Sequence, residues 1–449
     1  MTTKDKIMPS KPNTTPESNQ LELIRRGFTG TRLLFRAFYI WGLVALYNKK
    51  IISRKYLSDS SSSFGKAFVK AAERQKAGLI KIGQLGSLRS DLIPQEITDE
   101  LAKLQDKVEP HPYSEIESQI FQQLENDPEN IFASFDKNAI AAASLGQVHH
   151  AVLQNGQEVA VKVQYPCIEK AVRVDMAVLK IGMRIFGLLT IANTMKIFAE
   201  LNESIHTEMD YLAEGTAAEE INRNLSEAPQ LKDLFLIPKI YWEHTRPKVL
   251  TMEYLPGIKI NDTKKLGEAG LEIEEILTHT GQLFLHQIFK DGLFHADPHP
   301  GNLFVAKDGK IILLDFGMHR RLENKLRDAI RHNMIATITR DVDLYALSMI
   351  EGGFISNDDA EKVREMAIFQ FDPKFHNLSA KEIARMDFGE YFMGMRSRLK
   401  DIESFQLPSG VIMWGRSLGL LMSLFGELAP TQKPLDLISS YVIEFLSSD

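Results

Sequence analysis

The residues best suited to chemistry in this chain lie in one stretch, 294–317. His295 and Asp297 come first, Asn302 follows five residues after Asp297, and Asp315 opens the triplet Asp-Phe-Gly. Carboxylate and amide oxygens are the ligands that magnesium prefers, and a positioned carboxylate can also accept a proton from a hydroxyl group or a water. Asp297, Asn302 and Asp315 are therefore candidates for a catalytic or a metal-binding role.

A β-hairpin is predicted to bring two of these residues together. Two short apolar runs, 303–305 and 311–314, are separated by a turn of sequence Lys-Asp-Gly-Lys, which is typical of a hairpin. Asn302 and Asp315 flank it, so we expect them to be neighbours although they are thirteen residues apart in the sequence. The alternative is that Asp and Asn serve only as turn formers, but the order and spacing of the whole pattern disfavour it.

This order and spacing resembles the catalytic loop and metal-binding turn of protein kinases, where two Asp and one Asn surround the phosphates and magnesium of ATP. The resemblance implies that Asp297 is catalytic, that Asn302 and Asp315 hold a metal ion, and that ATP and Mg²⁺ are the cofactors. Ala296 stands where ordinary protein kinases carry Arg. In many of them that Arg receives a phosphorylated activation loop, so we expect this switch to be absent.

A lysine in a strand-like run is the predicted ligand of the nucleotide phosphates. Lys162 lies in the alternating segment 158–164, and a lysine on a buried strand needs an anion nearby. Phosphate oxygens and an acidic side chain would supply it. We assign Glu214 as that acid and count both residues as catalytic, because an active kinase site requires this ion pair. An edge-strand lysine in water and a solvated acidic helix face are the alternatives.

Two further segments are predicted to bind the nucleotide. An alanine-rich loop precedes the Lys162 strand where a kinase would carry glycines, so it should hold phosphates with a different geometry; a plain turn is the alternative. Two predicted strands, 236–242 and 248–254, lead into a segment that suits the hinge between lobes. The predicted nucleotide-binding residues are Lys162, the loop residues Ala141, Ala142, Ala143, Ser144, Gly146 and Gln147, and the hinge residues Met252, Glu253, Tyr254 and Leu255.

A third unusual element, Lys81-Ile-Gly-Gln84, lies in a helical stretch that three glycines interrupt. Gly78, Gly83 and Gly86 each cost a helix roughly 1 kcal/mol relative to alanine, which suggests that another backbone or a ligand approaches closely there. Lys81 and Gln84 share one helix face with Ser87 and could reach one site together. The functional interpretation and a plain helix fit this element equally well.

Together these elements resemble the UbiB/AarF family of atypical kinases, which includes the ADCK proteins. The resemblance covers about residues 60 to 435 and is carried by Lys81–Gln84, the loop 141–147, Lys162, Glu208, Asp210, Glu214, the segment 295–302, Asp315–Gly317, Arg416 and 428–430. It implies an α+β, protein-kinase-like two-lobed fold with an added N-terminal helical Lys-x-Gly-Gln extension, which covers the site of a protein substrate. Lys81 would then meet Glu208 or Asp210, so these three and Gln84 are the predicted regulatory residues.

The resemblance also implies a function. It indicates an ATPase that supports ubiquinone (isoprenoid quinone) biosynthesis at a membrane, with lipid or quinone-pathway intermediates, a membrane surface and quinone-biosynthesis proteins as partners. The alanine-rich loop disfavours ordinary protein phosphorylation. Two alternatives stay open: a protein or small-molecule kinase that transfers the γ-phosphate of ATP, and a nucleotide-binding pseudokinase scaffold. Filled catalytic and metal-binding positions argue against the scaffold.

Length and composition limit the remaining possibilities. The 449 residues predict two lobes with separate cores. The net charge of −6 argues against nucleic acid as a partner, since that needs a basic face. Cys167 is the single cysteine, so an internal disulfide is excluded and a reducing compartment is favoured.

Five segments are predicted along the chain: a disordered tail 1–20, an amphipathic membrane-proximal helical segment 21–57, a helical extension 58–130 opened by a polar linker 58–63, a kinase-like N-lobe 131–255 and a C-lobe 256–449. The apolar run 37–47 is too short to span a bilayer. Its basic flanks and aromatic residues suit a helix at a membrane surface, and packing on the protein suits it equally. The end, 435–449, is too short and polar for a membrane anchor, so we expect a cytoplasmic protein peripherally associated with the inner membrane.

Overall fold

The computed structural model describes residues 16–87, 93–105, 109–189, 194–371, 379, 382 and 411–433. The chain divides into two compact units, Met1–Leu212 with Ile240–Tyr254 and Ala213–Lys239 with Leu255–Asp449. The chain passes from one unit to the other at 212/213, 239/240 and 254/255, and the predicted boundary between lobes, 255/256, lies one residue from the last of these points. The segment 213–239 differs from the prediction, because it belongs to the second unit: one of its strands joins the sheet of that unit, and its Glu220 pairs with Arg321 at 2.7 Å.

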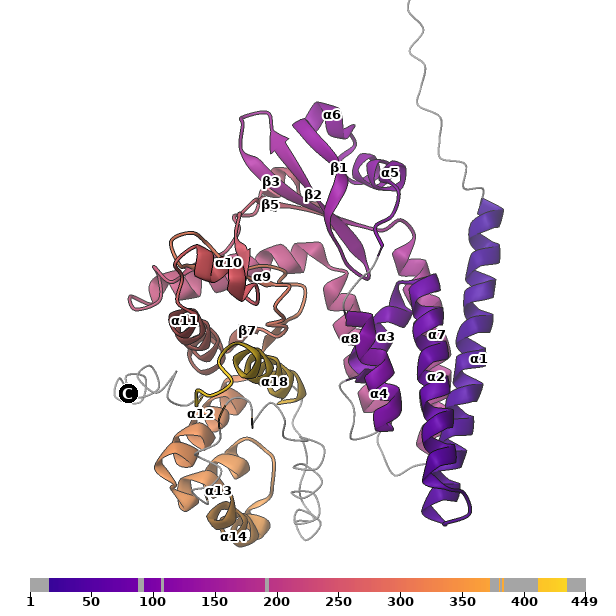
Figure 1. The fold of residues 1–449 in the computed structure, drawn as a ribbon, viewed down its shortest axis with the longest axis vertical. Helices are drawn as coiled ribbons and strands as arrows, with labels where there is room; N and C mark the ends of the chain where they lie inside the picture. Colours follow the sequence, from indigo (N-terminus) through magenta and orange to yellow (C-terminus); the bar gives the residue numbers. More distant parts are fainter. Residues whose placement is uncertain are drawn as a thin grey trace, which may run out of the picture. The chain divides into compact units, whose positions relative to one another are not determined.

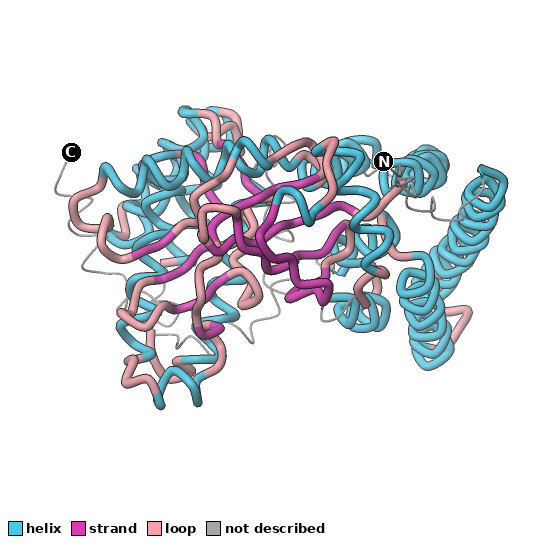
Figure 2. The backbone as a smooth tube through the Cα atoms, turned by 90° about the horizontal axis from the view of Figure 1, so that it is seen from above, coloured by secondary structure: helices cyan, strands magenta, loops and turns pink. Residues whose placement is uncertain are grey.

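The first unit is built on a four-stranded antiparallel sheet. Its order is β1 (Phe132–Ala142), β2 (Gly146–Leu153), β3 (Glu158–Gln164) and β5 (Val249–Glu253). The valines of β3 are fully buried and pack with Ile116 and Ile120 of α5 (Tyr113–Leu124). The segment around α5 and α6 (Pro128–Ile131) therefore belongs with the sheet and not, as predicted, with the extension 58–130. The strands are magenta in Figure 2.

The other helices of the first unit precede the sheet or follow β3 (Figure 1). They are α1 (Pro16–Asn48), α2 (Arg54–Gln75), α3 (Gly78–Ser87), α4 (Gln95–Ala102), the turn η1 (Lys103–Gln105), α7 (Ile168–Leu189), α8 (Thr194–Glu208) and the turn η2 (Trp242–His244). α9 (Tyr211–Glu227) begins in the first unit and continues in the second. Helices α1, α2 and α3 with α4 share a separate apolar core.

α1 packs along α7 through small residues. The two helices run parallel: Gly30 faces Val178, Gly182 faces Leu34, and Phe38 stacks on Phe186 with ring centroids 4.4 Å apart. A side chain on Gly182 would overlap the end of the Leu34 side chain, so a larger residue there would force Leu34 to move. One face of α1 therefore packs on the protein, as one of the two predicted alternatives requires. Among the described residues, no helix is both long and apolar enough to cross a bilayer.

Two predictions about the N-terminal region are wrong. The serine-rich segment 58–63 is not a linker but lies inside α2. Ser53 caps the start of this helix, and Leu57 and Phe64 on either side of the serines are buried against the protein. The predicted tail 1–20 overlaps α1, which begins at Pro16. The rest of that tail, 1–15, lies outside the described residues, as does the predicted polar end 435–449.

The second unit contains two small sheets and a group of helices. One sheet has the order β4 (Phe235–Leu236), β9 (Ile311–Leu313), β8 (Leu303–Val305) and β6 (Ile258–Lys259), and the other pairs β7 (Leu293–His295) with β10 (His319–Arg321). The helical elements are α10 (Thr263–Glu268), α11 (Ile273–His286), the π-turn η3 (Gln287–Asp291), α12 (Asn324–Thr339), α13 (Val342–Glu351), the turn η4 (Asn357–Asp359), α14 (Ala360–Gln370) and α18 (Val411–Leu428).

The predicted hairpin is confirmed, since β8 and β9 pair antiparallel. The predicted strand 248–254 corresponds to β5, but the predicted strand 236–242 is wrong. Leu236 ends β4, Ile240 makes only a single bridge to Met252, and a 3₁₀ turn begins at Trp242. Pro238 explains the break, because proline has no N–H to donate to a strand ladder.

Candidate functional site

His295 anchors the loop that carries Asp297. Its Nε2–H donates to the carbonyl of Leu314 at 3.0 Å, and its Nδ1 accepts the backbone N–H of Asp297 at 3.1 Å. These two partners require a neutral ring with its proton on Nε2. The backbone N–H of His295 is in turn held by Gln287, in the π-turn after α11. The ring therefore ties the start of the loop to the residue just before Asp315.

Asn302 lies between Asp297 and Asp315, as the hairpin predicts. Its Nδ2 donates to the carbonyl of Asp297 at 3.1 Å, and its own carbonyl accepts the N–H of Leu314 at 2.9 Å. Because the amide nitrogen faces Asp297, the side-chain oxygen is the atom left for a ligand. His299 tightens the loop further, since its Nδ1 accepts the N–H of Gly301 at 3.0 Å.

Asp315 adopts a left-handed backbone with φ 58°. Few residues other than glycine take this conformation, and Asp and Asn are among those that do. Its Oδ1 accepts the N–H of Gly317 at 3.2 Å, which stabilises the turn. Residues held in this region of backbone space tend to gather at functional sites.

The donor set fits magnesium bound together with a nucleotide. Within the described ranges, no three His, Cys, Asp or Glu side chains come close enough together to hold a metal ion. Mg²⁺ does not need such a cluster, because it is usually bound by one or two carboxylates together with water and substrate phosphates. Asp315 and the side-chain oxygen of Asn302 match that requirement.

The alanine-rich loop is a tight hairpin between β1 and β2. The N–H of Ala143 donates to the carbonyl of Gly146 at 2.8 Å, and the carbonyl of Leu145 accepts the N–H of Tyr165 at 3.0 Å. A Cβ on Gly146 would lie 2.5 Å from the carbonyl oxygen of Val163, so glycine is required there for packing. Ser144 and Leu145 are buried, whereas Ala141 and Ala143 are exposed. A ligand would therefore meet the alanines first.

Gln147 does not present its side chain to a nucleotide as predicted. It is buried, its Oε1 accepts the backbone N–H of His111 at 2.7 Å, and its Nε2 lies 2.9 Å from Nε2 of His149. Gln147 thus attaches the segment before α5 to β2. The prediction went wrong because alternation along β2 turns this residue into the protein.

Lys162 lies on β3 and is buried, as predicted. Its Nζ sits over the ring of Tyr211 at 5.1 Å from the centroid, a favourable cation–π arrangement. Glu214 is also buried, and a buried carboxylate needs compensating partners. Lys162 and Glu214 belong to different compact units, so the ion pair between them stays a prediction.

The predicted hinge residues 252–255 begin inside β5, which ends at Glu253. Met252 pairs with Ala160 and Glu253 with Val159, while the N–H of Tyr254 donates to the carbonyl of Glu158 at 3.1 Å. That N–H is therefore already used within the sheet and is not available to an adenine ring. Leu255 begins the next unit. Adenine binding by the hinge residues stays a prediction.

The Lys-x-Gly-Gln helix is α3, and its lysine pairs with the acidic segment as the resemblance implies. Nζ of Lys81 lies 2.7 Å from Oε2 of Glu208, both mostly buried. Gln84 points elsewhere, because its Nε2 donates to the carbonyl of Leu104 at 3.0 Å. The prediction that Lys81 and Gln84 reach one site together is therefore not met.

The acidic segment that contains Glu208 and Asp210 is not one continuous helix. α8 ends at Glu208 and α9 begins at Tyr211, while Oδ1 of Asp210 accepts the N–H of Leu212 at 3.1 Å. Asp210 is thus the cap of α9, a position that favours Asp. Gln164 at the end of β3 donates to the carbonyl of Met209 and holds this corner in place.

The glycines of α3 serve close packing by side chains. A Cβ on Gly83 would overlap Leu104, and one on Gly78 would lie 2.6 Å from Oδ2 of Asp175. The predicted close approach is therefore present, but its partners are side chains of η1 and α7 and not another backbone.

Comparison with known proteins identifies the family. The model of the ABC1 atypical kinase-like domain matches residues 103–348. The chain belongs to this family. The match begins in η1 and ends in α13, so it includes the sheet of the first unit and the hairpin between Asn302 and Asp315. The resemblance seen in the sequence is thereby confirmed, and the kinase-like α+β fold with it.

This member of the ABC1 family has relatives in plants and bacteria. It is 33% identical over 371 residues to the Arabidopsis thaliana protein named ACTIVITY OF BC1 COMPLEX KINASE 8, chloroplastic, covering 77% of this chain and 48% of that protein. It is 34% identical over 297 residues to the Pseudomonas paraeruginosa protein named probable protein kinase UbiB, covering 64% and 55%. The chain thus spans about half the length of these curated relatives.

A solved structure shares the fold of this ABC1 family member. The complex of Rv3197 with erythromycin from Mycobacterium tuberculosis matches with a TM-score of 0.52 and 23% identity, over 79% of this chain and 92% of that chain. At this identity the likeness concerns the fold alone.

Sequence reasoning missed the roles of three residues near these motifs. Tyr211 lies under Lys162, Gln287 holds His295, and Arg416 contacts Asp297. Asp210 followed by an aromatic residue was a usable signal for a helix start. Nothing local marks Gln287, and Arg416 stood out only through the family resemblance.

Proposed function

We propose that this ABC1 family chain binds ATP with Mg²⁺ and hydrolyses it, in support of isoprenoid quinone biosynthesis at a membrane. The observation that carries the proposal is the joint geometry of the loop and the hairpin in the second unit. His295 and Asn302 both fix the backbone of Asp297, and Asn302 bonds to the residue before Asp315. In this proposal the carboxylate of Asp297 faces the reacting group, and the carboxylate of Asp315 and the side-chain oxygen of Asn302 would hold the metal.

Each residue has a defined task in this proposal. Lys162 contacts the α- and β-phosphates, Glu214 orients Lys162, and Asp297 positions the attacking water. Asn302 and Asp315 would hold magnesium, which when bound neutralises charge on the phosphates. Asp297 needs no strong basicity for this task, because catalysis of phosphoryl transfer depends mainly on positioning and electrostatic stabilisation.

Hydrolysis is favoured over transfer to a protein by two features of the first unit. Lys81 forms a mostly buried ion pair with Glu208. This ion pair joins the Lys-x-Gly-Gln extension to the acidic segment that precedes Glu214. The loop that replaces the glycine-rich turn is a short hairpin with a buried tip. The link to quinone biosynthesis rests on the likeness to proteins named UbiB.

The test is magnesium-dependent ATP binding and phosphate release by the pure full-length chain. We expect binding of a fluorescent ATP analogue that requires Mg²⁺, and release of phosphate without transfer to other proteins. A chain that binds no ATP in the presence of Mg²⁺ would refute the proposal. Robust transfer of labelled phosphate from ATP to a pool of proteins would favour the kinase alternative.

We also propose that the exposed face of α1 and α7 contacts the membrane. Phe28 and Phe35 on α1 are 74% and 71% exposed, and Leu188 on α7 is 85% exposed. Together with Tyr39, Ile181 and Ile185 they form what we call the apolar face. Exposed Arg25, Arg32 and Arg184 lie on the same helices. Aromatic and aliphatic residues interleaved with arginines suit the interface of an anionic membrane.

Replacing Phe28 and Phe35 with Ser should weaken binding to vesicles of phosphatidylcholine mixed with phosphatidylglycerol at least tenfold, because burial of one such side chain contributes about 1.5–3 kcal/mol. Co-sedimentation measures the loss. The matched control is Phe121→Ser, which removes an exposed phenylalanine of α5 and should change nothing. Equal binding by the double variant and the parent would contradict a membrane role for this face.

A further inference from the structure

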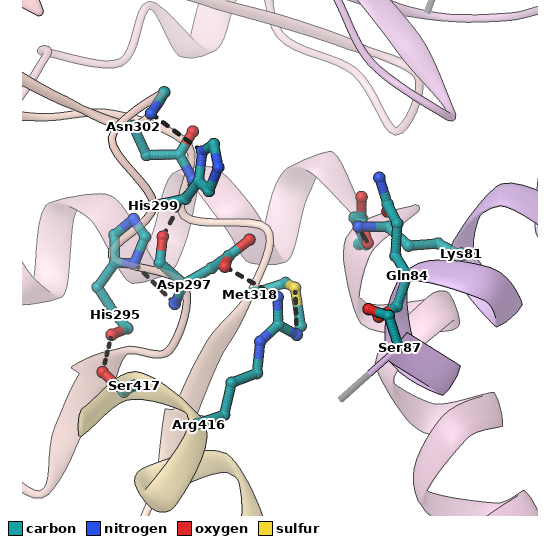
Figure 3. A network of polar contacts seen from close by, with 12 residues as sticks. Lys81, Gln84, Ser87, His295, Asp297, His299, Asn302, Met318, Arg416 and Ser417 are labelled. Atoms are coloured by element: carbon teal, nitrogen blue, oxygen red, sulfur yellow. Dashed lines mark hydrogen bonds and ion pairs between the residues drawn. The ribbon is translucent and has the colours of Figure 1, made fainter. Parts of the chain in front are cut away.

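Arg416 of α18 contacts the carboxylate of Asp297 (Figure 3). Its Nη2 donates to Oδ1 of Asp297 at 2.8 Å, and the two side chains are only 15% and 20% exposed. Its Nη1 lies 3.4 Å from Sδ of Met318, and the neighbouring Ser417 donates to the carbonyl of His295 at 3.3 Å. α18 is thus fixed to the loop and to the residue after the Asp-Phe-Gly turn.

The guanidinium of Arg416 has more donors than the described residues satisfy. Within the described part of the chain, its Nε is buried and has no hydrogen-bond partner. A buried donor of a charged group left without a partner costs free energy, and such groups call for a functional explanation. A ligand with several acceptor oxygens would satisfy it.

The loop around Asp297 lacks a positive charge of its own. The segment 293–303 contains no Lys and no Arg. During phosphoryl transfer, negative charge spreads over three oxygens of the transferred group, and enzymes commonly place an arginine there. Arg416 brings a cation to this loop from 119 residues away in the sequence.

We propose that Arg416 is a catalytic residue of this site, whose guanidinium contacts oxygens of the transferred phosphoryl group while Asp297 keeps it in place. The inference rests on the proposed ATP hydrolysis. In that reaction the water oxygen bonds to the γ-phosphorus, and the bond from that phosphorus to the bridging oxygen breaks with its electron pair staying on ADP. The proton of the water passes to the carboxylate of Asp297 and then to solvent. Arg416 transfers no atom and stabilises charge.

Three variants of the full-length chain test this role: Arg416→Ala, Arg416→Lys and the control Ser417→Ala. We expect Arg416→Ala to lower kcat about 10²-fold, as removal of one stabilising donor does in other enzymes, with KM for ATP little changed. Affinity for ADP with aluminium fluoride, an analogue of the transition state, should fall in the same proportion. Arg416→Lys should keep part of the activity, added guanidinium should restore part of the activity of Arg416→Ala, and Ser417→Ala should change kcat only slightly.

Other outcomes would overturn the inference. If Arg416→Ala and Ser417→Ala lower stability and turnover alike, with no rescue by guanidinium and no preferential loss of the transition-state analogue, Arg416 is a structural clamp. A rise in kcat for Arg416→Ala would show instead that Arg416 restrains Asp297. A parent chain that neither binds nor hydrolyses ATP would overturn the proposed function and this inference with it.

Discussion

Replacing Asp315 with Asn should abolish magnesium-dependent ATP turnover while the fold stays intact. Asn has the same shape, tolerates the left-handed backbone at φ 58°, and can still accept the N–H of Gly317 through its side-chain oxygen. What it lacks is the negative charge that would bind the metal. Since a bound metal contributes several kcal/mol to stabilisation of the transition state, turnover should fall by about 10³-fold or more. Phosphate release at saturating Mg²⁺ measures the loss.

The same substitution at Asp308 is the matched control. Asp308 lies in the turn of the same hairpin and its side chain is exposed, so Asp308→Asn should leave turnover and thermal stability unchanged. A difference in turnover between the two variants would show that the lost charge at Asp315, and not a change in the hairpin, causes the fall in turnover. Turnover by Asp315→Asn close to that of the parent would show that this residue is not a metal ligand.

The structural features around the candidate site that the sequence predicted correctly are those made by local structure. The turn between β8 and β9 fixes the approach of Asn302 to Asp315, and only the intervening residues are needed to foresee it. The same holds for Lys162, since alternation along β3 places it in the sheet. Lys81 and Glu208 are far apart in the sequence, and their ion pair was expected only because of the family resemblance.

Contacts between distant segments were not predictable from one sequence. Arg416 meets Asp297 across 119 residues, and Arg26 meets Asp175 across 149. No local pattern distinguishes these arginines from exposed ones such as Arg25. The prediction that Gln147 binds the nucleotide also failed because of a contact with a distant segment. The segment around His111, which binds the side chain of Gln147, lies outside β2 and its hairpin.

Replacing Arg26 with Met should lower the free energy of unfolding of the first unit by about 3–5 kcal/mol. Nε and Nη2 of Arg26 donate to the two carboxylate oxygens of Asp175 at 2.7 and 2.6 Å, and the side chains are only 5% and 1% exposed. Arg26 also donates to the carbonyls of Gln75 and Lys76 at the end of α2. Its loss leaves Asp175 buried without a cation. Denaturant unfolding followed by circular dichroism measures the change.

The matched control is Arg25→Met, the same substitution one residue earlier on the exposed face of α1, which should change stability by less than about 0.5 kcal/mol. The double variant Arg26→Met with Asp175→Asn should recover part of the loss, because it removes the unpaired charge. Equal stability of Arg26→Met and Arg25→Met would contradict a structural role for this ion pair.

The destabilisation by Arg26→Met should also depend on pH. Burial raises the pKa of Asp175, and Arg26 opposes that rise, so the substitution raises the pKa of the folded state further. A carboxyl group whose pKa is higher in the folded than in the unfolded state costs stability as the pH increases between the two values. The deficit should therefore be smaller at about pH 5 than at about pH 8.

Asp175 lies directly against Gly78 at the start of α3, the helix that carries Lys81. Loss of the ion pair between Arg26 and Asp175 should therefore weaken the ion pair between Lys81 and Glu208 before the sheet unfolds.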